Sequence, residues 1–235
     1  MKRITVLGTG TEIGKTHASI ALSSVISAMG ISITALKPIE SGVPLNPKEA
    51  STDSGSLAAF SSYPATSPPY AFPDPVSPHL AARWAKLKID LPLIRTWVDS
   101  HAARVILVET AGAVLSPLDR GVTNLDLTRK LEPTQVLLVA PDRLGVLHDV
   151  TAALHAYRTL APELPEPLVL LQPPATSDSS TGTNAEELVW LGITSNVFVF
   201  PRAKPTDPAV QEVARQVLKA WNFPNLASPQ QNSAS

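Results

Sequence analysis

The chain has 235 residues, with 19 basic and 20 acidic side chains, a net charge of −1 and no cysteine. These values exclude a disulfide framework and Cys-ligated metal sites, and they give no general attraction to nucleic acid. No apolar run approaches the ~20 residues of a membrane span, and the stretch before Gly8 is too short for the apolar core of a signal peptide. We therefore expect a globular, cytoplasmic protein that binds neither membranes nor nucleic acid.

The first 40 residues predict a strand, a loop, a helix and a second strand. Residues 3–7 form a short β-branched apolar run, and residues 14–29 carry apolar side chains at helical spacing. Gly30 stands where a helix often ends, and residues 31–36 are the next strand-like run. In a parallel sheet this unit requires a right-handed crossover.

Four later apolar runs are predicted as strands, with helical patterns before and between them. Runs that are apolar on both faces are typical of a parallel sheet covered by helices on both sides. The alternation predicts a doubly wound α/β fold with a single domain over residues 1–224 and a disordered tail over 225–235. The predicted strands are 104–108, 135–140, 168–171 and 197–200, and the predicted helices are 78–87, 91–101, 123–131, 145–160, 184–190 and 208–221.

Residues 8–16, Gly-Thr-Gly-Thr-Glu-Ile-Gly-Lys-Thr, join the first predicted strand to the first helix. A glycine-rich turn that opens a helix directs backbone N–H groups toward an anion. Lys15 is placed to neutralise β- and γ-phosphates, and the Thr16 hydroxyl is placed to coordinate magnesium. Counted from Gly8, the loop is one residue longer than the standard motif, and Ile13 replaces the third glycine of a dinucleotide fingerprint. We predict a nucleoside-triphosphate site on a P-loop NTPase-like fold.

Two charged residues directly follow predicted strands. Lys37 comes after the strand at 31–36, and Glu109 after the strand at 104–108. Ligands bind at this edge of an open α/β sheet, so both side chains are expected near Lys15. Two lysines at one phosphoryl group suit phosphoryl transfer, and a carboxylate near the phosphates suits magnesium. Asp53 lies in a polar stretch that by itself favours a helix N-cap.

These motifs, in this order, resemble the dethiobiotin synthase family. The resemblance covers most of residues 1–160 and implies an ATP- and magnesium-dependent cyclo-ligase. Such an enzyme forms dethiobiotin from 7,8-diaminopelargonic acid and carbon dioxide through a phosphorylated carbamate. The segments that carry the resemblance are 8–16, 37–38, 41–42, Asp53, 73–79 with Ser77-Pro78-His79, 109–112 and 144–147.

The resemblance also implies roles for single residues. Lys15 and Lys37 would be catalytic, Lys15 on the phosphates and Lys37 on the carbamate. Thr11 and Ser41 would contact the amine or carbamate end of the substrate. The implied magnesium ligands are Thr16, Asp53 and Glu109. The implied nucleotide contacts are Glu12, Ile13, Gly14, Lys15, Thr16, His17, Asp53, Glu109, Thr110, Ala111, Gly112, Gln172, Pro201, Arg202 and Ala203.

The family is homodimeric, and its substrate site is shared across the interface. The substrate carboxylate would lie at a helix N-terminus of the partner subunit, which suits an anion because of the unpaired N–H groups there. The segment expected in that place is Gly145, Val146, Leu147 and His148.

Two segments depart from the family pattern. Gln172-Pro173 stands where the family reads the nucleotide base with an Asn-Asp pair, so we predict a relaxed preference among nucleoside triphosphates. Thr110 and Ala113 replace glycines after Glu109 and are expected to narrow the approach of the backbone to the ligand. A nucleotide switch and a small-acid kinase on the same fold remain alternative functions.

Overall fold

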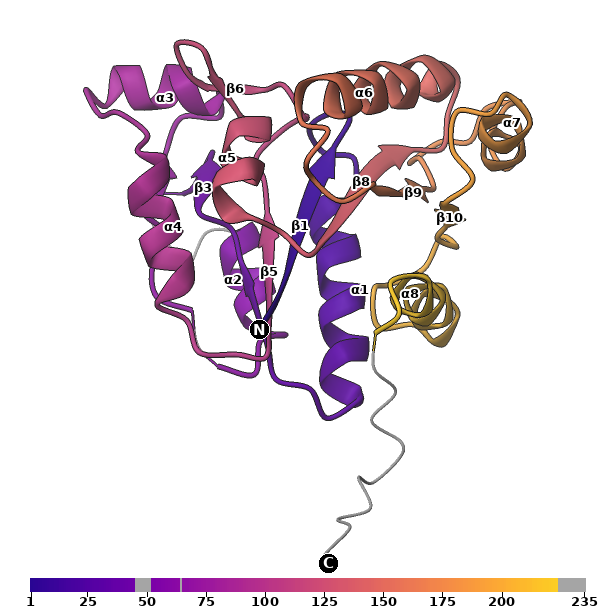
Figure 1. The fold of residues 1–235 in the computed structure, drawn as a ribbon, viewed down its shortest axis with the longest axis horizontal. Coiled ribbons are helices and arrows are strands. Elements are labelled where there is room, and N and C mark those ends of the chain that lie inside the picture. Colours follow the sequence, from indigo (N-terminus) through magenta and orange to yellow (C-terminus); the bar gives the residue numbers. More distant parts are fainter. Residues whose placement is uncertain (45–51, 64, 224–235) are drawn as a thin grey trace, which may run out of the picture.

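A computed structural model describes residues 1–44, 52–63 and 65–223 of the chain. Its centre is a six-stranded sheet in the order β10-β9-β8-β1-β5-β2, in which every neighbouring pair is parallel (Figure 1). The strands are β1 (Lys2–Gly8), β2 (Ile33–Leu36), β5 (Val105–Glu109), β8 (Gln135–Pro141), β9 (Leu168–Gln172) and β10 (Val197–Val199).

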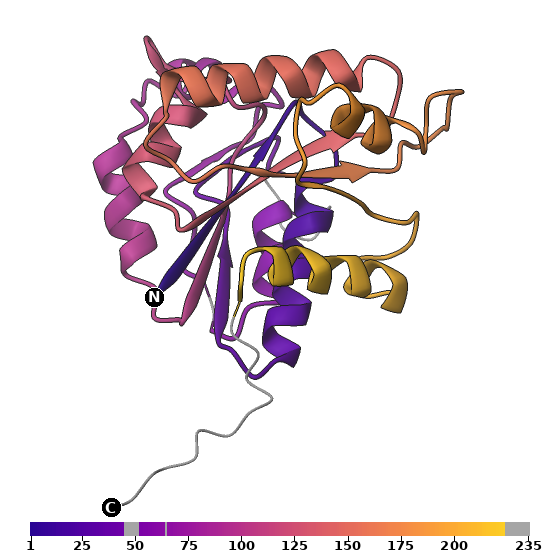
Figure 2. The same ribbon diagram turned by 45° about the vertical axis from the view of Figure 1, so that its right-hand side comes forward.

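Helices cover both faces of this sheet, and the alternation of side chains along each strand explains why. Leu137 and Val139 of β8 belong to one buried apolar cluster, whereas Val136 and Leu138 belong to another. Figure 2 shows the sheet between α6 above and α1 and α8 below. The first cluster packs against α1 (Lys15–Ala28), α2 (Asp53–Ala58) and α8 (Pro208–Ala220). The opposite face is covered by α3 (Pro78–Trp84), α4 (Leu91–Asp99), α5 (Asn124–Leu131), α6 (Val146–Leu160) and α7 (Asn184–Trp190).

The predicted doubly wound α/β fold is confirmed, and each predicted strand and helix is present within about three residues of its expected ends. The predicted domain over 1–224 stays a prediction, and the tail predicted over 225–235 lies outside the described residues. In the part of the chain that the structure describes, no helix is both long and apolar enough to span a membrane.

The sequence patterns missed one helix and two small sheets. Helix α2 has six residues, and its predicted role was limited to an N-cap at Asp53. Strands β3 (Ile39–Ser41) and β4 (Tyr70–Phe72) pair in parallel, while β6 (Pro117–Asp119) and β7 (Val122–Thr123) form a hairpin. These strands have two or three residues, which is too short for an alternating pattern to stand out. Of these strands, β3 places Glu40 and Ser41 beside the P-loop.

Candidate active site

The P-loop adopts a backbone that only certain residues allow. Gly14 has φ +87°, and a Cβ there would lie 2.9 Å from Cγ of Gln172. A Cβ on Gly8 would lie 2.8 Å from Cδ1 of Ile13, so the Ile13 side chain would have to shift, whereas at Gly14 the positive φ itself favours glycine. Glu12 also has a positive φ of 56°. The loop therefore has a tight, preformed shape immediately before α1.

Lys15 begins α1 and folds back onto the loop. Its Nζ donates a hydrogen bond to the carbonyl oxygen of Gly10 at 2.7 Å. Burial lowers the pKa of Lys15 to about 8; Glu109 raises it, and the positive charge of Lys37 lowers it further. An anion beside this ammonium would stabilise its charge, so the residue is suited to bind phosphate.

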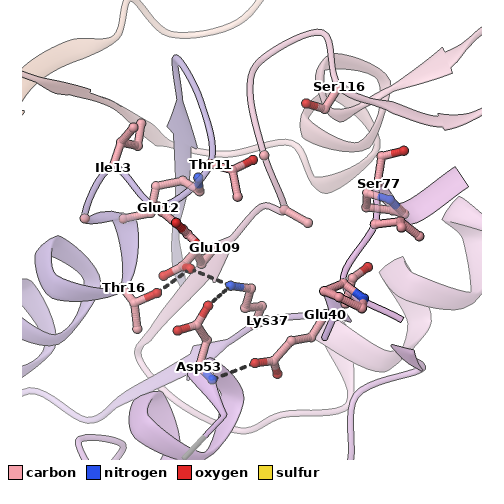
Figure 3. A pocket seen from close by; sticks show the side chains of 18 residues that line it. Thr11, Glu12, Ile13, Thr16, Lys37, Glu40, Asp53, Ser77, Glu109 and Ser116 are labelled. Carbon is pink, nitrogen blue, oxygen red and sulfur yellow. Dashed lines mark hydrogen bonds and ion pairs between the residues drawn. The ribbon is translucent and has the colours of Figure 1, made fainter. Parts of the chain in front are cut away.

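Lys37 lies between two carboxylates at the carboxyl edge of the sheet (Figure 3). Its Nζ contacts Asp53 Oδ2 and lies 3.1 Å from Glu109 Oε1. Burial acts to lower the pKa of Lys37, but Glu109 and Asp53 outweigh it, so the pKa lies above its ordinary value. Lys37 is therefore positively charged, and two ion pairs fix the position of its ammonium group.

Glu109 is completely buried at the end of β5. It contacts both Lys37 and helix α1, which follows the P-loop. Its Oε1 accepts a hydrogen bond from Thr16 Oγ1 at 2.8 Å, and its Oε2 accepts one from Ser19 Oγ at 2.9 Å. Ser19 was missed in the sequence, although it stands one helical turn after Lys15. Such hydrogen bonds are what allows a carboxylate to stay charged in a buried place.

Glu40 is the second residue that the sequence patterns missed. Its two carboxylate oxygens accept hydrogen bonds from the backbone N–H groups of Asp53 at 2.6 Å and Ser54 at 3.2 Å. The N-cap of α2 is Thr52 and not Asp53, because the Thr52 hydroxyl accepts from the N–H of Gly55. Asp53 is instead the first helical residue, with its side chain directed at Lys37. The only signal for Glu40 was its place within the motif 37–42.

A cavity of about 460 Å³, here named the P-loop cavity, lies between the loop, β3 and the segments that follow β4 and β5. Its hydroxyl groups come from Thr11, Thr16, Ser41, Ser77 and Ser116. Ser41 Oγ is buried without a hydrogen-bond partner among the described residues. The predicted site residues that line it are Thr11, Glu12, Ile13, Gly14, Lys15, Thr16, Lys37, Ser41, Asp53, Glu109, Ala111 and Gly112.

A second cavity of about 280 Å³, here named the side cavity, opens on the other side of the P-loop. Glu12, Ile13 and Gly14 line both cavities. The remaining walls come from α1, from the ends of β8 and β9 with the residues that follow β9, and from the segment after β10. They are formed by His17, Pro141, Gln172, Pro173, Pro174, Ala175, Arg202 and Ala203.

Several predicted residues lie elsewhere. Thr110 is buried, and its hydroxyl donates to the carbonyl oxygen of Val6 at 3.1 Å, so its side chain packs into the sheet and does not narrow either cavity. Pro201 and Thr110 line neither of the two cavities, and the same holds for residues 145–148 at the start of α6. His148 is exposed there. A role for 145–148 toward a partner subunit stays a prediction.

The oxygen donors at the site fit magnesium. Among the described residues no group of three or more His, Cys, Asp or Glu could hold a metal ion. The Asp53 and Glu109 carboxylates nevertheless both contact Lys37, and the Thr16 hydroxyl donates a hydrogen bond to Glu109, so one hydroxyl and two carboxylates lie close together. Mg²⁺ prefers such hard oxygen ligands and is commonly held by one or two carboxylates together with substrate phosphates and water.

Comparison with known proteins decides the family. Residues 2–176 match the family model described as AAA_26, an AAA domain. A protein of Methylobacterium nodulans named ATP-dependent dethiobiotin synthetase BioD is 31% identical over 198 residues, which cover 79% of this chain and 88% of the relative. The protein of that name from Caulobacter sp. strain K31 is 38% identical over 166 residues, covering 67% of this chain and 71% of the relative.

The chain belongs to the dethiobiotin synthetase family. The resemblance carried by the motifs is therefore confirmed. So is the predicted enzyme class, an ATP-dependent ligase that forms carbon–nitrogen bonds.

Solved structures of dissimilar sequence share the fold of this chain. The MinC:MinD cell division protein complex of Aquifex aeolicus matches with a TM-score of 0.57 at 10% identity, covering 93% of this chain and 96% of that chain. A ParA family ATPase from Chlorobium tepidum matches with a TM-score of 0.53 at 14% identity, covering 96% and 95%. These likenesses confirm the P-loop NTPase-like fold.

Proposed function

We propose that this protein closes the ureido ring of dethiobiotin from 7,8-diaminopelargonic acid, carbon dioxide and Mg-ATP. The observation that carries the proposal is the position of Lys37. Its ammonium lies between Asp53 and Glu109, and all three line the P-loop cavity together with Lys15 and Thr16. The cavity thus combines a phosphate-binding loop with a second ammonium group, that of Lys37, which can bind an anion other than the phosphates.

The P-loop and Lys15 would bind the triphosphate. Backbone N–H groups at the start of α1 and the Lys15 ammonium present positive charge to the β- and γ-phosphates. Thr16, Asp53 and Glu109 would hold Mg²⁺, which when bound neutralises phosphate charge. The contact between Lys15 and the Gly10 carbonyl would give way to a contact with phosphate.

Lys37 would stabilise the carbamate. One amine of the substrate adds to carbon dioxide, and the resulting carbamate is an anion that needs a cation beside it. A carbamate oxygen then attacks the γ-phosphorus, ADP leaves, and a carbamic–phosphoric anhydride forms. The second amine attacks the carbamate carbon, the ring closes, and phosphate departs with the carbamate oxygen. Positioning and charge stabilisation of this kind account for most of the catalysis in phosphoryl transfer.

The substrate end of the cavity would be formed by hydroxyl groups and by a second subunit. Thr11 and the unpartnered Ser41 hydroxyl can hydrogen-bond the amine or carbamate end. We propose a homodimer in which residues 145–148 of the partner subunit receive the substrate carboxylate. The support is that these residues lie exposed or half-buried at the start of the 15-residue helix α6, apart from buried Val146.

Mass spectrometry of the product tests the proposal. The enzyme is incubated with 7,8-diaminopelargonic acid, ¹³C-bicarbonate and Mg-ATP, and each component is omitted in turn. The expected product is dethiobiotin with one ¹³C atom, formed only in the complete mixture. A phosphorylated acid formed without bicarbonate would indicate a kinase. Hydrolysis of ATP that ignores the diamine but responds to a protein partner would indicate a nucleotide switch.

A further inference from the structure

Asn124 is a buried polar residue to which the sequence patterns gave no role. It is the first residue of α5 and has no exposed surface. The hairpin of β6 and β7 leads the chain back to the loop at 110–114, here named the β5 loop, which follows β5. There the side-chain Nδ2 of Asn124 donates hydrogen bonds to the carbonyl oxygens of Ala111 at 2.6 Å and Ala113 at 2.8 Å. One amide group therefore holds the β5 loop on both sides of Gly112.

These two contacts fix the orientation of the Asn124 amide. A backbone carbonyl oxygen can only accept a hydrogen bond, so the N–H groups face the β5 loop and Oδ1 points away from it. Oδ1 is buried and has no hydrogen-bond partner in the part of the chain that the structure describes. A buried oxygen without a partner lowers stability. The stability of α5 alone therefore does not explain an asparagine at this position, and the β5 loop that it holds is the feature to explain.

The backbone N–H groups of the β5 loop divide into three that are paired and two that are not. The N–H groups of Ala111 and Gly112 donate no hydrogen bond to any described residue. Gly112 has a φ of +84°, and Ala111 before it has a negative φ. Two successive N–H groups in such a turn form a concave binding site for an anion. The paired groups belong to Thr110, Ala113 and Val114, and their acceptors are Val6 O, Ser116 Oγ and Gly8 O.

This turn lies on the substrate side of the P-loop. Ala111 and Gly112 line the P-loop cavity and do not line the side cavity. A Cβ on Gly112 would lie 3.9 Å from Thr11 Oγ1, so the turn adjoins the residue proposed to contact the amine or carbamate. Lys37 lies at the same end, since it contacts Glu109 two residues before Ala111. The two unpaired N–H groups are therefore near the place where the γ-phosphate would meet the carbamate.

We propose that Asn124 is a positioning residue for phosphoryl transfer, an inference that rests on the proposed function. By binding the carbonyl oxygens of Ala111 and Ala113, it keeps them out of the cavity and leaves the N–H groups of Ala111 and Gly112 for the transferred phosphoryl group. Without the amide, these carbonyls lose their donor, and a carbonyl oxygen turned toward the cavity would repel the anion. Donors that are fixed before the reaction need no reorganisation when charge develops.

The variant Asn124→Leu keeps the approximate volume of the side chain and removes both N–H groups. We expect kcat to fall about 100-fold, the effect of misplacing a binding group by about 1 Å. The affinity for Mg-ADP should change little, because Lys15 and the P-loop carry its phosphates. Asn124→Asp keeps the shape and places a carboxylate in the first turn of α5, where helices favour it. It should lower kcat in the same way, because its oxygens face the two carbonyls.

Thr123→Ala is the matched control for a loss of helix stability. It removes the N-cap hydroxyl of the same helix, which pairs with Asp126 at 2.7 Å. It should lower the melting temperature and leave kcat near that of the wild type. If kcat falls as far in Thr123→Ala as in the Asn124 variants, if kcat and Mg-ADP affinity fall by the same factor, or if the Asn124 variants keep wild-type kcat, the proposal is wrong.

Binding of inorganic phosphate to the Mg-ADP complex measures the turn without turnover. In titration calorimetry, the wild type and Thr123→Ala should bind phosphate alike. Asn124→Leu should bind it about 10-fold or more weakly, the usual effect of losing a hydrogen bond to a charged group. Equal phosphate affinities in all three proteins, or no phosphate binding by the wild-type complex, would overturn the proposal.

These outcomes are distinct from the test of the proposed reaction. Weaker phosphate binding by Asn124→Leu, in a protein that forms no dethiobiotin, would keep the role of Asn124 for another phosphoryl transfer while the proposed function failed. Formation of dethiobiotin by Asn124→Leu at the wild-type rate would do the opposite.

Discussion

Lys37 and Glu109 meet 3.1 Å apart at the carboxyl ends of the neighbouring strands β2 and β5. Glu109 is fully buried, and Lys37 is 8% exposed. The two residues are 72 positions apart in the sequence, yet the register of two parallel strands brings them together. Because Glu109 also accepts from Thr16 and Ser19, this pair couples the phosphate loop to the second lysine of the site.

Replacing Lys37 by Met is expected to lower kcat roughly 100- to 1,000-fold, the usual effect of removing one group that stabilises developing charge. The affinity for ADP should change little, since Lys15 and the loop carry the phosphates. Steady-state kinetics and calorimetry measure the two effects. Lys88→Met is a matched control, because that side chain is 81% exposed and lies outside the P-loop cavity. Equal losses in kcat and ADP affinity would contradict the role of Lys37.

Replacing Glu109 by Gln is expected to destabilise the protein by about 3–5 kcal/mol, because it breaks a buried ion pair. The amide also offers one acceptor oxygen where the carboxylate offers two to Thr16, Ser19 and Lys37. Chemical denaturation measures the change in the free energy of unfolding. The pair of half-buried Asp119 with exposed Lys88, 3.7 Å apart, gives the control, since Asp119→Asn should cost about 1 kcal/mol or less. If the two variants lose similar amounts of the free energy of unfolding, the buried contacts of Glu109 contribute no more to stability than the Asp119 pair does.

Alanine substitutions at Gly14 and Gly30 distinguish the effect of backbone strain from the effect of steric crowding. Both have positive φ, 87° and 73°, but a Cβ on Gly14 would meet Gln172 at 2.9 Å, whereas one on Gly30 meets nothing within 4 Å. Gly30→Ala is expected to cost about 1–2 kcal/mol of left-handed strain. Gly14→Ala should cost about 1–3 kcal/mol more through overpacking, and it should also weaken ADP binding. If the two variants bind ADP equally well, the shape of the loop at Gly14 is not needed for phosphate binding.

Glu40→Ala is expected to reduce kcat by releasing the N-terminus of α2, because Glu40 holds the backbone N–H of Asp53. Thr52→Ala removes another capping bond of the same helix, the one to Gly55, and should cost stability by about 1 kcal/mol while keeping kcat. Enzyme assays and thermal unfolding of both variants measure the difference. A parallel loss of kcat in Thr52→Ala would mean that α2 acts through its overall stability and not through the placement of Asp53.

The fold and the P-loop were predictable because their signals are local. The strand, the glycine loop and the helix lie within the first 30 residues, and runs such as 104–108 are apolar on both faces. Lys37 and Glu109 were predictable because each directly follows a strand of a parallel sheet.

The contacts of Glu40 and Gln172 could not be predicted in the same way. Gln172 reaches Gly14 over 158 positions, and which amide atom faces the loop depends on the exact register of β9 against β8. Glu40 lies on a three-residue strand whose partner follows about 30 residues later, so no periodic pattern indicated its direction. The direction of the Thr110 side chain could not be predicted either. Its hydroxyl donates a hydrogen bond to Val6 on the neighbouring strand β1 and does not face either cavity.

The most direct test of the proposed reaction follows the oxygen atoms of bicarbonate. If a carbamate oxygen attacks the γ-phosphorus and later departs with the phosphate, ¹⁸O-bicarbonate must transfer one ¹⁸O atom to inorganic phosphate for each ring that closes. We predict that phosphate isolated from the complete mixture with 7,8-diaminopelargonic acid and Mg-ATP carries this label, as measured by mass spectrometry. Unlabelled phosphate formed together with dethiobiotin would contradict the phosphorylated carbamate and the role assigned to Lys37.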